Sequence, residues 1–192
     1  MYVHPSTELF DHGIDSIVTS LSGISTVALL GLGSSPFWAA THACCVWSFF
    51  YLPTYQHLVT GRMVFSAGLD NPTEGLVGTM LLLLIQGAFP HCLSISLQSV
   101  VPLVFRIYEN DFVASVHSLL GGIDVVTMLL SMPLKYWLVV GEVLSALSAI
   151  VATLRTTFSI PTVLRPGLGS KNALVALVPL LLTWVVSIGC VL

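Results

Sequence analysis

The chain has 192 residues, of which 55% are hydrophobic and 8% are charged, and its formal net charge is -3 at pH 7. Its mean hydropathy is +0.95, whereas about a quarter of the residues in a soluble domain are charged. This composition indicates an integral membrane protein and excludes an ordinary soluble domain. The six basic residues are scattered and form no patch, so we expect no binding to nucleic acid.

Long charge-free stretches predict several membrane spans. No Asp, Glu, Lys or Arg occurs between Asp15 and Arg62 or between Glu74 and Arg106, and about 20 apolar residues suffice for one helical span. Turn residues divide these stretches and predict an all-α, multi-pass helix bundle in one membrane domain, residues 1–192. We expect about seven spans, near 14–33, 36–54, 75–89, 91–105, 112–131, 136–154 and 172–192.

Two parts of this pattern decide the topology. The run Gly31-Leu32-Gly33-Ser34-Ser35-Pro36 holds the turn residues between the first two predicted spans, so we expect a tight helical hairpin there. The segment 91–105 is short and contains Pro102, so a re-entrant or interfacial segment is the alternative to a span. Five of the six basic residues fall on one side if it crosses. We therefore predict a crossing, with the N-terminus cytoplasmic and the C-terminus across the membrane.

Two aspartates, Asp11 and Asp15, precede the first apolar run. On a helix, carboxylates at i and i+4 project from one face and repel each other by a few tenths of a kcal/mol unless a cation lies between them. Mg²⁺ binds one or two carboxylates together with the phosphate oxygens of a substrate. The alternative is a helix start whose acids favour the macrodipole. The spacing therefore predicts a site for a hard divalent cation.

Three segments resemble the CDP-alcohol phosphotransferase family, in its choline and ethanolamine phosphotransferase type. The segment Glu-Leu-Phe-Asp-His-Gly-Ile-Asp-Ser at 8–16 resembles the second half of the family signature, D-x2-D-G-x2-A-R-x8-G-x3-D-x3-D. The segment Phe-Tyr-Leu-Pro-Thr-Tyr at 50–55 resembles the family's FYLSTW, and Asn-Pro-Thr-Glu-Gly at 71–75 resembles its PTEG. The first half of the signature is absent, and Thr7, Gln56 and His57 depart from the pattern. We therefore expect a fragment, a truncated gene product or a degenerate relative.

The resemblance implies a phosphotransferase of phospholipid synthesis. Such an enzyme transfers phosphoethanolamine or phosphocholine from CDP-ethanolamine or CDP-choline to diacylglycerol and releases CMP. The resemblance implies Mg²⁺ or Mn²⁺ held by Asp11 and Asp15, with Asp15 or His12 as the catalytic base. It also implies the endoplasmic reticulum or Golgi membrane, and a homodimer is one expected assembly. Whether this chain is active as it stands is left open.

Glu8, Asn71 and Glu74 are the predicted substrate-binding residues. For two of them a structural role is the alternative, because Glu74 would be an acid in the first turn of a helix that begins near Pro72, and Asn71 its cap. The resemblance covers about residues 6–80, so the remainder of the chain is interpreted from hydropathy alone.

Further ionisable residues lie inside predicted spans. Asp124 shares a predicted helix face with His117, and Glu142 comes early in the next span. An ionisable group at membrane depth indicates a functional site. Asp124 would either line a lipid or nucleotide cavity or pair across a helix interface with His117 or Glu142. His42 and His91 are predicted to be hydrogen-bonded interior or interfacial residues and not metal ligands.

Two other functions compete with the phosphotransferase. The first is a transporter or channel whose polar path is formed by Asp11, Asp15, Asp124 and Glu142. The chain shows no internal repeat, however, and many transporters are built from repeats. The second is a catalytically inactive member of the same family that stabilises a partner enzyme.

Overall fold

The computed structural model describes residues 5–61, 72–96, 99, 129, 131–159 and 170–191. These residues are mostly helical and include no strand, which confirms the all-α prediction. In chain order the elements are α1 (Pro5–Leu29), η1 (Leu32–Ser34), α2 (Pro36–Thr60), α3 (Pro72–Ala88), η2 (Cys92–Ser94), α7 (Leu134–Ser159), α8 (Ser170–Val175) and α9 (Val178–Gly189). Several predicted features lie outside the described residues, namely Arg62, Asn71, Arg106, His117, Asp124 and nearly all of the predicted span 112–131.

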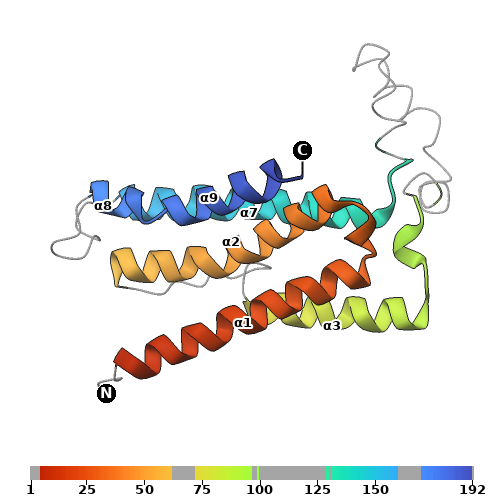
Figure 1. Ribbon diagram of the computed structural model, residues 1–192, viewed down its shortest axis with the longest axis horizontal. Coiled ribbons are helices and arrows are strands. Elements are labelled where there is room, and N and C mark those ends of the chain that lie inside the picture. Colours follow the sequence, from red (N-terminus) through yellow and green to blue (C-terminus); the bar gives the residue numbers. More distant parts are fainter. Residues whose placement is uncertain are drawn as a thin grey trace, which may run out of the picture. The chain divides into compact units, whose positions relative to one another are not determined.

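The first two helices form the predicted hairpin (Figure 1). The chain reverses at Gly31, whose φ of 61° lies in the left-handed region that favours glycine. α2 then begins at Pro36, where a missing N–H is tolerated. It ends at Thr60 and is capped by Gly61, which has a φ of 74°. The bounds differ from the prediction at three ends, because α1 starts before residue 14 and ends at Leu29 instead of near 33, and α2 runs past residue 54.

The chain divides into two compact units, residues 1–83 with 141–192 and residues 84–140. Within the first unit, α2 packs against both α1 and α9, and Figure 1 shows α9 running alongside α2. Buried Tyr55 and Val59 of α2 cluster with residues of the α8–α9 region, and Leu154 of α7 packs against that cluster. α2 is therefore the central helix of this unit.

The second unit departs from the prediction at the beginning of the segment 91–105, of which residues 91–96 and 99 are described. His91 has a φ of 76°, η2 follows it, and Ser96 forms an isolated antiparallel bridge with Pro133. The Leu134 N–H donates to the Ile95 carbonyl at 2.9 Å. An α-helical span therefore does not begin at His91, because a left-handed residue and extended backbone interrupt the helical hydrogen bonds there.

Two helical stretches are long and apolar enough to cross a membrane, Leu134–Phe158 and Lys171–Gly189. The apolar stretch Gly75–Ala88 in α3 is shorter. Only 17% and 11% of the most apolar windows of the two long stretches are buried, whereas the core helix of a soluble protein is mostly buried. The described residues thus support membrane association through two helices, and the other predicted spans stay predictions.

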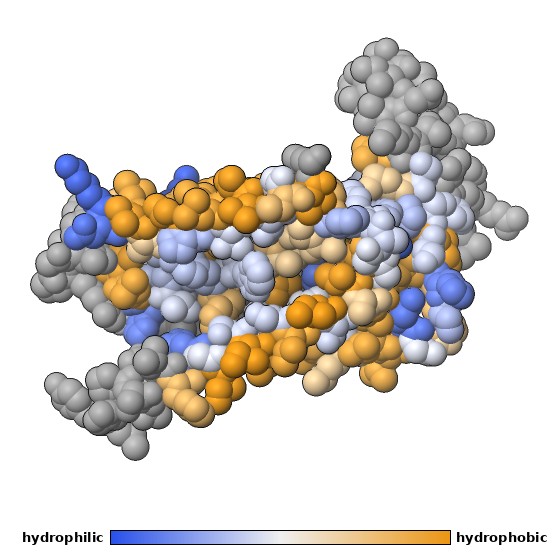
Figure 2. Space-filling model, in the orientation of Figure 1, coloured by the Kyte–Doolittle hydropathy of each residue, from blue (hydrophilic) through white to orange (hydrophobic). Residues whose placement is uncertain are grey.

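Several polar side chains of the described residues are buried, and many large apolar ones are exposed. The buried polar residues are Thr26, Thr41, His42, Ser48, Gln56, Thr153 and Thr157. Exposed leucine, isoleucine and valine side chains lie along α1, α3, α7 and α9. Figure 2 shows apolar side chains gathered along α1 and over α9, with more polar side chains between them over α2. A soluble domain has the opposite tendency, so this distribution fits an apolar surrounding.

Candidate functional site

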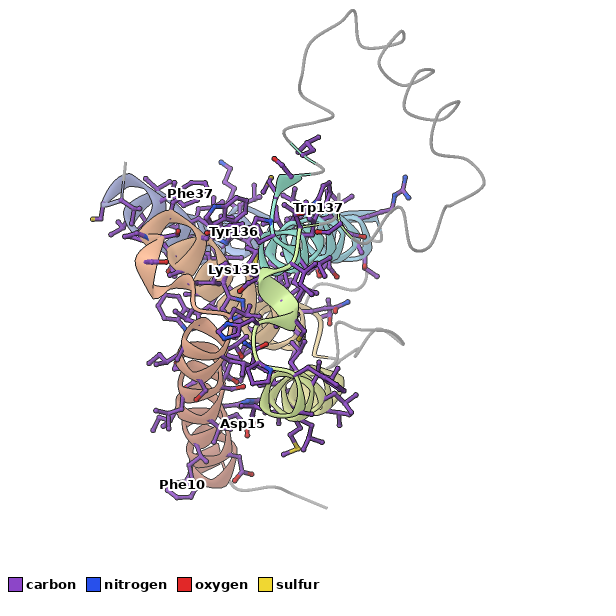
Figure 3. The ribbon with its side chains drawn as sticks, turned by 90° about the vertical axis from the view of Figure 1, so that its right-hand side faces the viewer. Phe10, Asp15, Phe37, Lys135, Tyr136 and Trp137 are labelled. Atoms are coloured by element: carbon purple, nitrogen blue, oxygen red, sulfur yellow. The ribbon has the colours of Figure 1, made fainter. Side chains whose placement is uncertain are left out.

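The predicted acidic pair lies at the beginning of α1. Asp11 and Asp15 are on one uninterrupted helix, so their i, i+4 placement is confirmed. Both residues are exposed, and neither forms a hydrogen bond or an ion pair with another residue of the described part. Figure 3 shows Phe10 and Asp15 projecting from this end of the helix. Two adjacent carboxylates are therefore available to a ligand on one face of α1.

The other predicted site residues surround this pair in the sequence. His12 is half-buried, and as the neighbour of Asp11 it points about 100° around the helix from it. Glu8 lies on α1 three residues before Asp11, and Glu74 lies in the first turn of α3, which begins at Pro72 as predicted. The side chains of both glutamates are outside the described part, as is the whole of Asn71.

The acidic pair fits part of a hard-cation site. It offers two accessible carboxylates without protein partners in the described part, and carboxylate oxygens are the ligands that Mg²⁺ prefers. Among the described side chains, no group of three or more His, Cys, Asp or Glu is placed to hold a metal ion. A cation bound to the pair would therefore take its remaining ligands from water, from substrate phosphate or from other parts of the protein.

A second ionisable pair lies inside the first unit. His42 Nδ1 of α2 and Glu142 Oε2 of α7 are 2.6 Å apart, a distance typical of a charge-assisted hydrogen bond. The His42 side chain is 2% exposed and the Glu142 side chain 31% exposed. This contact confirms His42 as a hydrogen-bonded interior residue. It also gives Glu142 a partner that the sequence did not indicate, because Asp124 was the expected one.

The second ring nitrogen of His42, Nε2, has no hydrogen-bond partner among the described residues. This atom is buried, and the same is true of Thr157 Oγ1, which also has no partner in that part of the chain. A buried polar atom without a partner has a desolvation penalty of about 1–3 kcal/mol. The hydrogen bond with Glu142 therefore holds the ring in a position that burial alone would not favour.

α2 and α9 are joined by polar contacts along one face of α2. Trp184 Nε1 donates to Ser48 Oγ at 2.9 Å, and Ser48 Oγ donates to the Cys44 carbonyl at 2.7 Å. The Cys44 thiol faces the Thr183 carbonyl at 3.9 Å. These contacts let two apolar helices pack closely while every polar group named here finds a partner.

Two tyrosines of the segment that resembles FYLSTW face the break between α8 and α9. Pro179 has no N–H, and the helical hydrogen bonds lapse before it, which leaves carbonyls free at the end of α8. The Tyr55 hydroxyl donates to the Ala173 carbonyl at 3.1 Å, and the Tyr51 hydroxyl donates to the Ala176 carbonyl. These side chains therefore close a break in a helix, a role that sequence reasoning missed and that Pro179 could have suggested.

In comparisons with protein families, with curated proteins and with solved structures, no match to this chain was found.

Proposed function

We propose that this chain belongs to a membrane phosphotransferase of the CDP-alcohol type. It would transfer phosphoethanolamine or phosphocholine from the CDP-alcohol to diacylglycerol, with release of CMP. The observation that carries the proposal is the Asp11–Asp15 pair, exposed and one turn apart at the start of an apolar helix, within the Glu-Leu-Phe-Asp-His-Gly-Ile-Asp-Ser segment. Like charges so placed are stabilised by a cation and a phosphate-bearing substrate.

Each residue has a defined part in the proposed reaction. Asp11 and Asp15 would hold a divalent cation, which would supply positive charge to the pyrophosphate and the departing CMP. The diacylglycerol hydroxyl oxygen attacks the β-phosphorus, and the bond from that phosphorus to the CMP oxygen breaks. Asp15 or His12 accepts the hydroxyl proton, since both lie on the same turn of α1. Glu8 and Glu74 are assigned to the head group.

The surroundings of α7 support a membrane location. Lys135, Tyr136 and Trp137 stand at its start (Figure 3), Lys135 Nζ lies 5.2 Å from the Tyr136 ring centre, and Trp137 donates to the Leu129 carbonyl at 3.2 Å. Aromatic and basic side chains gather where a helix enters the headgroup region. We assign the protein to a multi-pass topology of about seven spans in the endoplasmic reticulum or Golgi membrane.

A transporter or channel is the second candidate. The observation that favours it is the His42–Glu142 pair, because a buried histidine joined to a partly exposed acid places ionisable groups within the helix packing. In this candidate the pair would belong to a polar path, and the acids of α1 would form its mouth.

Release of CMP in reconstituted vesicles separates these functions. Vesicles containing diacylglycerol and Mg²⁺ receive CDP-ethanolamine or CDP-choline, and the chain is assayed alone and preceded by a segment carrying D-x2-D-G-x2-A-R. We expect transfer only by the extended chain, and a loss of about 10²- to 10³-fold in kcat for Asp11→Asn. Thr19→Ala, one turn beyond Asp15 on the same face, is the matched control and should keep its activity. Ion flux without CMP release would favour the transporter. Transfer by the unextended chain would refute the requirement for the two aspartates of the absent first half of the signature.

A further inference from the structure

An open hollow lies against one face of α7. Its volume is about 700 Å³, and it is lined by Leu147, Ser148, Val151, Ala152, Arg155 and Thr156. Leu147 and Val151 are exposed apolar side chains, 50% and 62% accessible. These residues recur at helical spacing, so the hollow runs along the helix for about 12 Å from Leu147 to Arg155.

The two ends of the hollow differ in polarity. Leu147 and Val151 supply apolar surface over most of its length, whereas Arg155 supplies a cation at the end nearer the C-terminus of α7. Arg155 is exposed and forms no ion pair within the described residues. The Thr156 hydroxyl donates to the Ala152 carbonyl, so it does not compete for an anion as a donor. A ligand that matches the hollow is apolar along its length and carries negative charge at one end.

We propose that this hollow binds one anionic phospholipid, with an acyl chain along Leu147 and Val151 and the phosphate at Arg155. The helix containing it is long and apolar enough to cross a membrane, and only 17% of its most apolar window is buried, so lipid is the surrounding that reaches the hollow. A basic side chain at the headgroup level attracts anionic lipid. The site does not depend on phosphotransferase activity, and lipid binding can fail or succeed independently of CMP release.

A second copy of α7 is the competing occupant. Ser148 and Ala152 are small residues four apart, which permits close helix packing. Such packing would bury Arg155 of both copies near each other, and no acid of the described α7 residues lines this hollow. Charge complementarity therefore favours lipid phosphate over a second helix.

Native mass spectrometry of the full chain in neutral detergent tests the site. The chain is titrated with dioleoylphosphatidylglycerol, with dioleoylphosphatidylcholine and, as the free anion, with inorganic phosphate. We expect one tightly bound phosphatidylglycerol, about fivefold tighter than phosphatidylcholine, as one basic residue near the surface provides. Inorganic phosphate should not displace it. Equal affinity for the two lipids, or displacement by inorganic phosphate, would overturn the proposal.

Matched variants show which residues cause the preference for phosphatidylglycerol. Arg155→Gln should remove the preference for phosphatidylglycerol and Arg155→Lys should keep it, because both basic side chains attract phosphate. Ala152→Phe should weaken binding of both lipids by filling the hollow, whereas Leu181→Phe on α9 should leave binding unchanged. The proposal is wrong if Lys171→Gln reduces the preference as much as Arg155→Gln. It is also wrong if Ala152→Phe converts a dimer to a monomer without changing lipid binding.

Discussion

Carboxylates at the beginning of α1 and between α2 and α7 differ in exposure and in hydrogen bonding. Asp11 and Asp15 are exposed and have no partner among the described residues, whereas Glu142 is held 2.6 Å from a buried histidine. An acid already paired across a helix interface is occupied by that partner, and removing one of the two leaves a polar group unsatisfied. Two acids left unpaired on one turn repel each other and are free to bind a ligand. Under the proposed function, the acids of α1 bind the ligand, and the His42–Glu142 pair joins α2 to α7.

The largest expected effect concerns the base at the α1 site. In the extended, active chain, Asp15→Asn and His12→Ala should both lower kcat. Loss of the base should flatten the rise in rate toward neutral pH, whereas loss of a ligand should be partly offset by excess metal. Full pH profiles of kcat at low and high Mg²⁺ distinguish the two residues. If neither variant alters the profile or the metal dependence, the functional assignment of α1 is wrong.

A smaller effect is expected at the His42–Glu142 pair. Glu142→Ala leaves both ring nitrogens of His42 without partners, and we expect the free energy of unfolding to fall by about 1–3 kcal/mol. Replacing both partners with apolar residues, His42→Phe with Glu142→Leu, should recover most of that loss. The free energy of unfolding of each variant is measured in detergent micelles, and Ser148→Ala serves as the control on the same helix. A Glu142→Ala chain as stable as the wild type would mean that the pair does not hold α7 to α2.

The smallest effect concerns the break between α8 and α9. Tyr55→Phe removes the hydrogen bond to the Ala173 carbonyl, and we expect a loss of about 0.6–1 kcal/mol. In a Pro179→Ala background the loss should be smaller, because removal of the proline ring lets the helix continue through residue 177, whose N–H can then donate to the Ala173 carbonyl. The free energies of unfolding of the wild type, Tyr55→Phe, Pro179→Ala and the double variant measure the coupling between the two residues. An equal loss in both backgrounds would contradict the assigned role of the tyrosine.

Features that depend on neighbouring residues could be predicted from the sequence. The turn at Gly31, the start of α3 at Pro72 and the placement of Asp11 and Asp15 on one helix all follow from local preferences. The beginning of the segment 91–105 was predicted less well, because hydropathy does not indicate the left-handed backbone at His91.

Contacts between distant residues could not be predicted in this way. His42 and Glu142 are 100 residues apart in the chain, and Tyr55 and Ala173 are 118 apart. Hydropathy and charge spacing indicate which face of a helix is polar, but they do not indicate which other helix packs against that face. The buried position of His42 could be expected from its apolar neighbours, whereas its partner could not.

Binding of Mn²⁺ to the 192-residue chain tests the central claim most directly. Electron paramagnetic resonance of a Mn²⁺ titration should show weak binding in the millimolar range, about 4 kcal/mol, because two carboxylates leave most of the ion's ligands to water. Asp11→Asn and Asp15→Asn should each abolish it, and Glu142→Gln should not. Binding that persists unchanged in both aspartate variants, or that is lost in Glu142→Gln, would contradict the assignment of the cation site to α1.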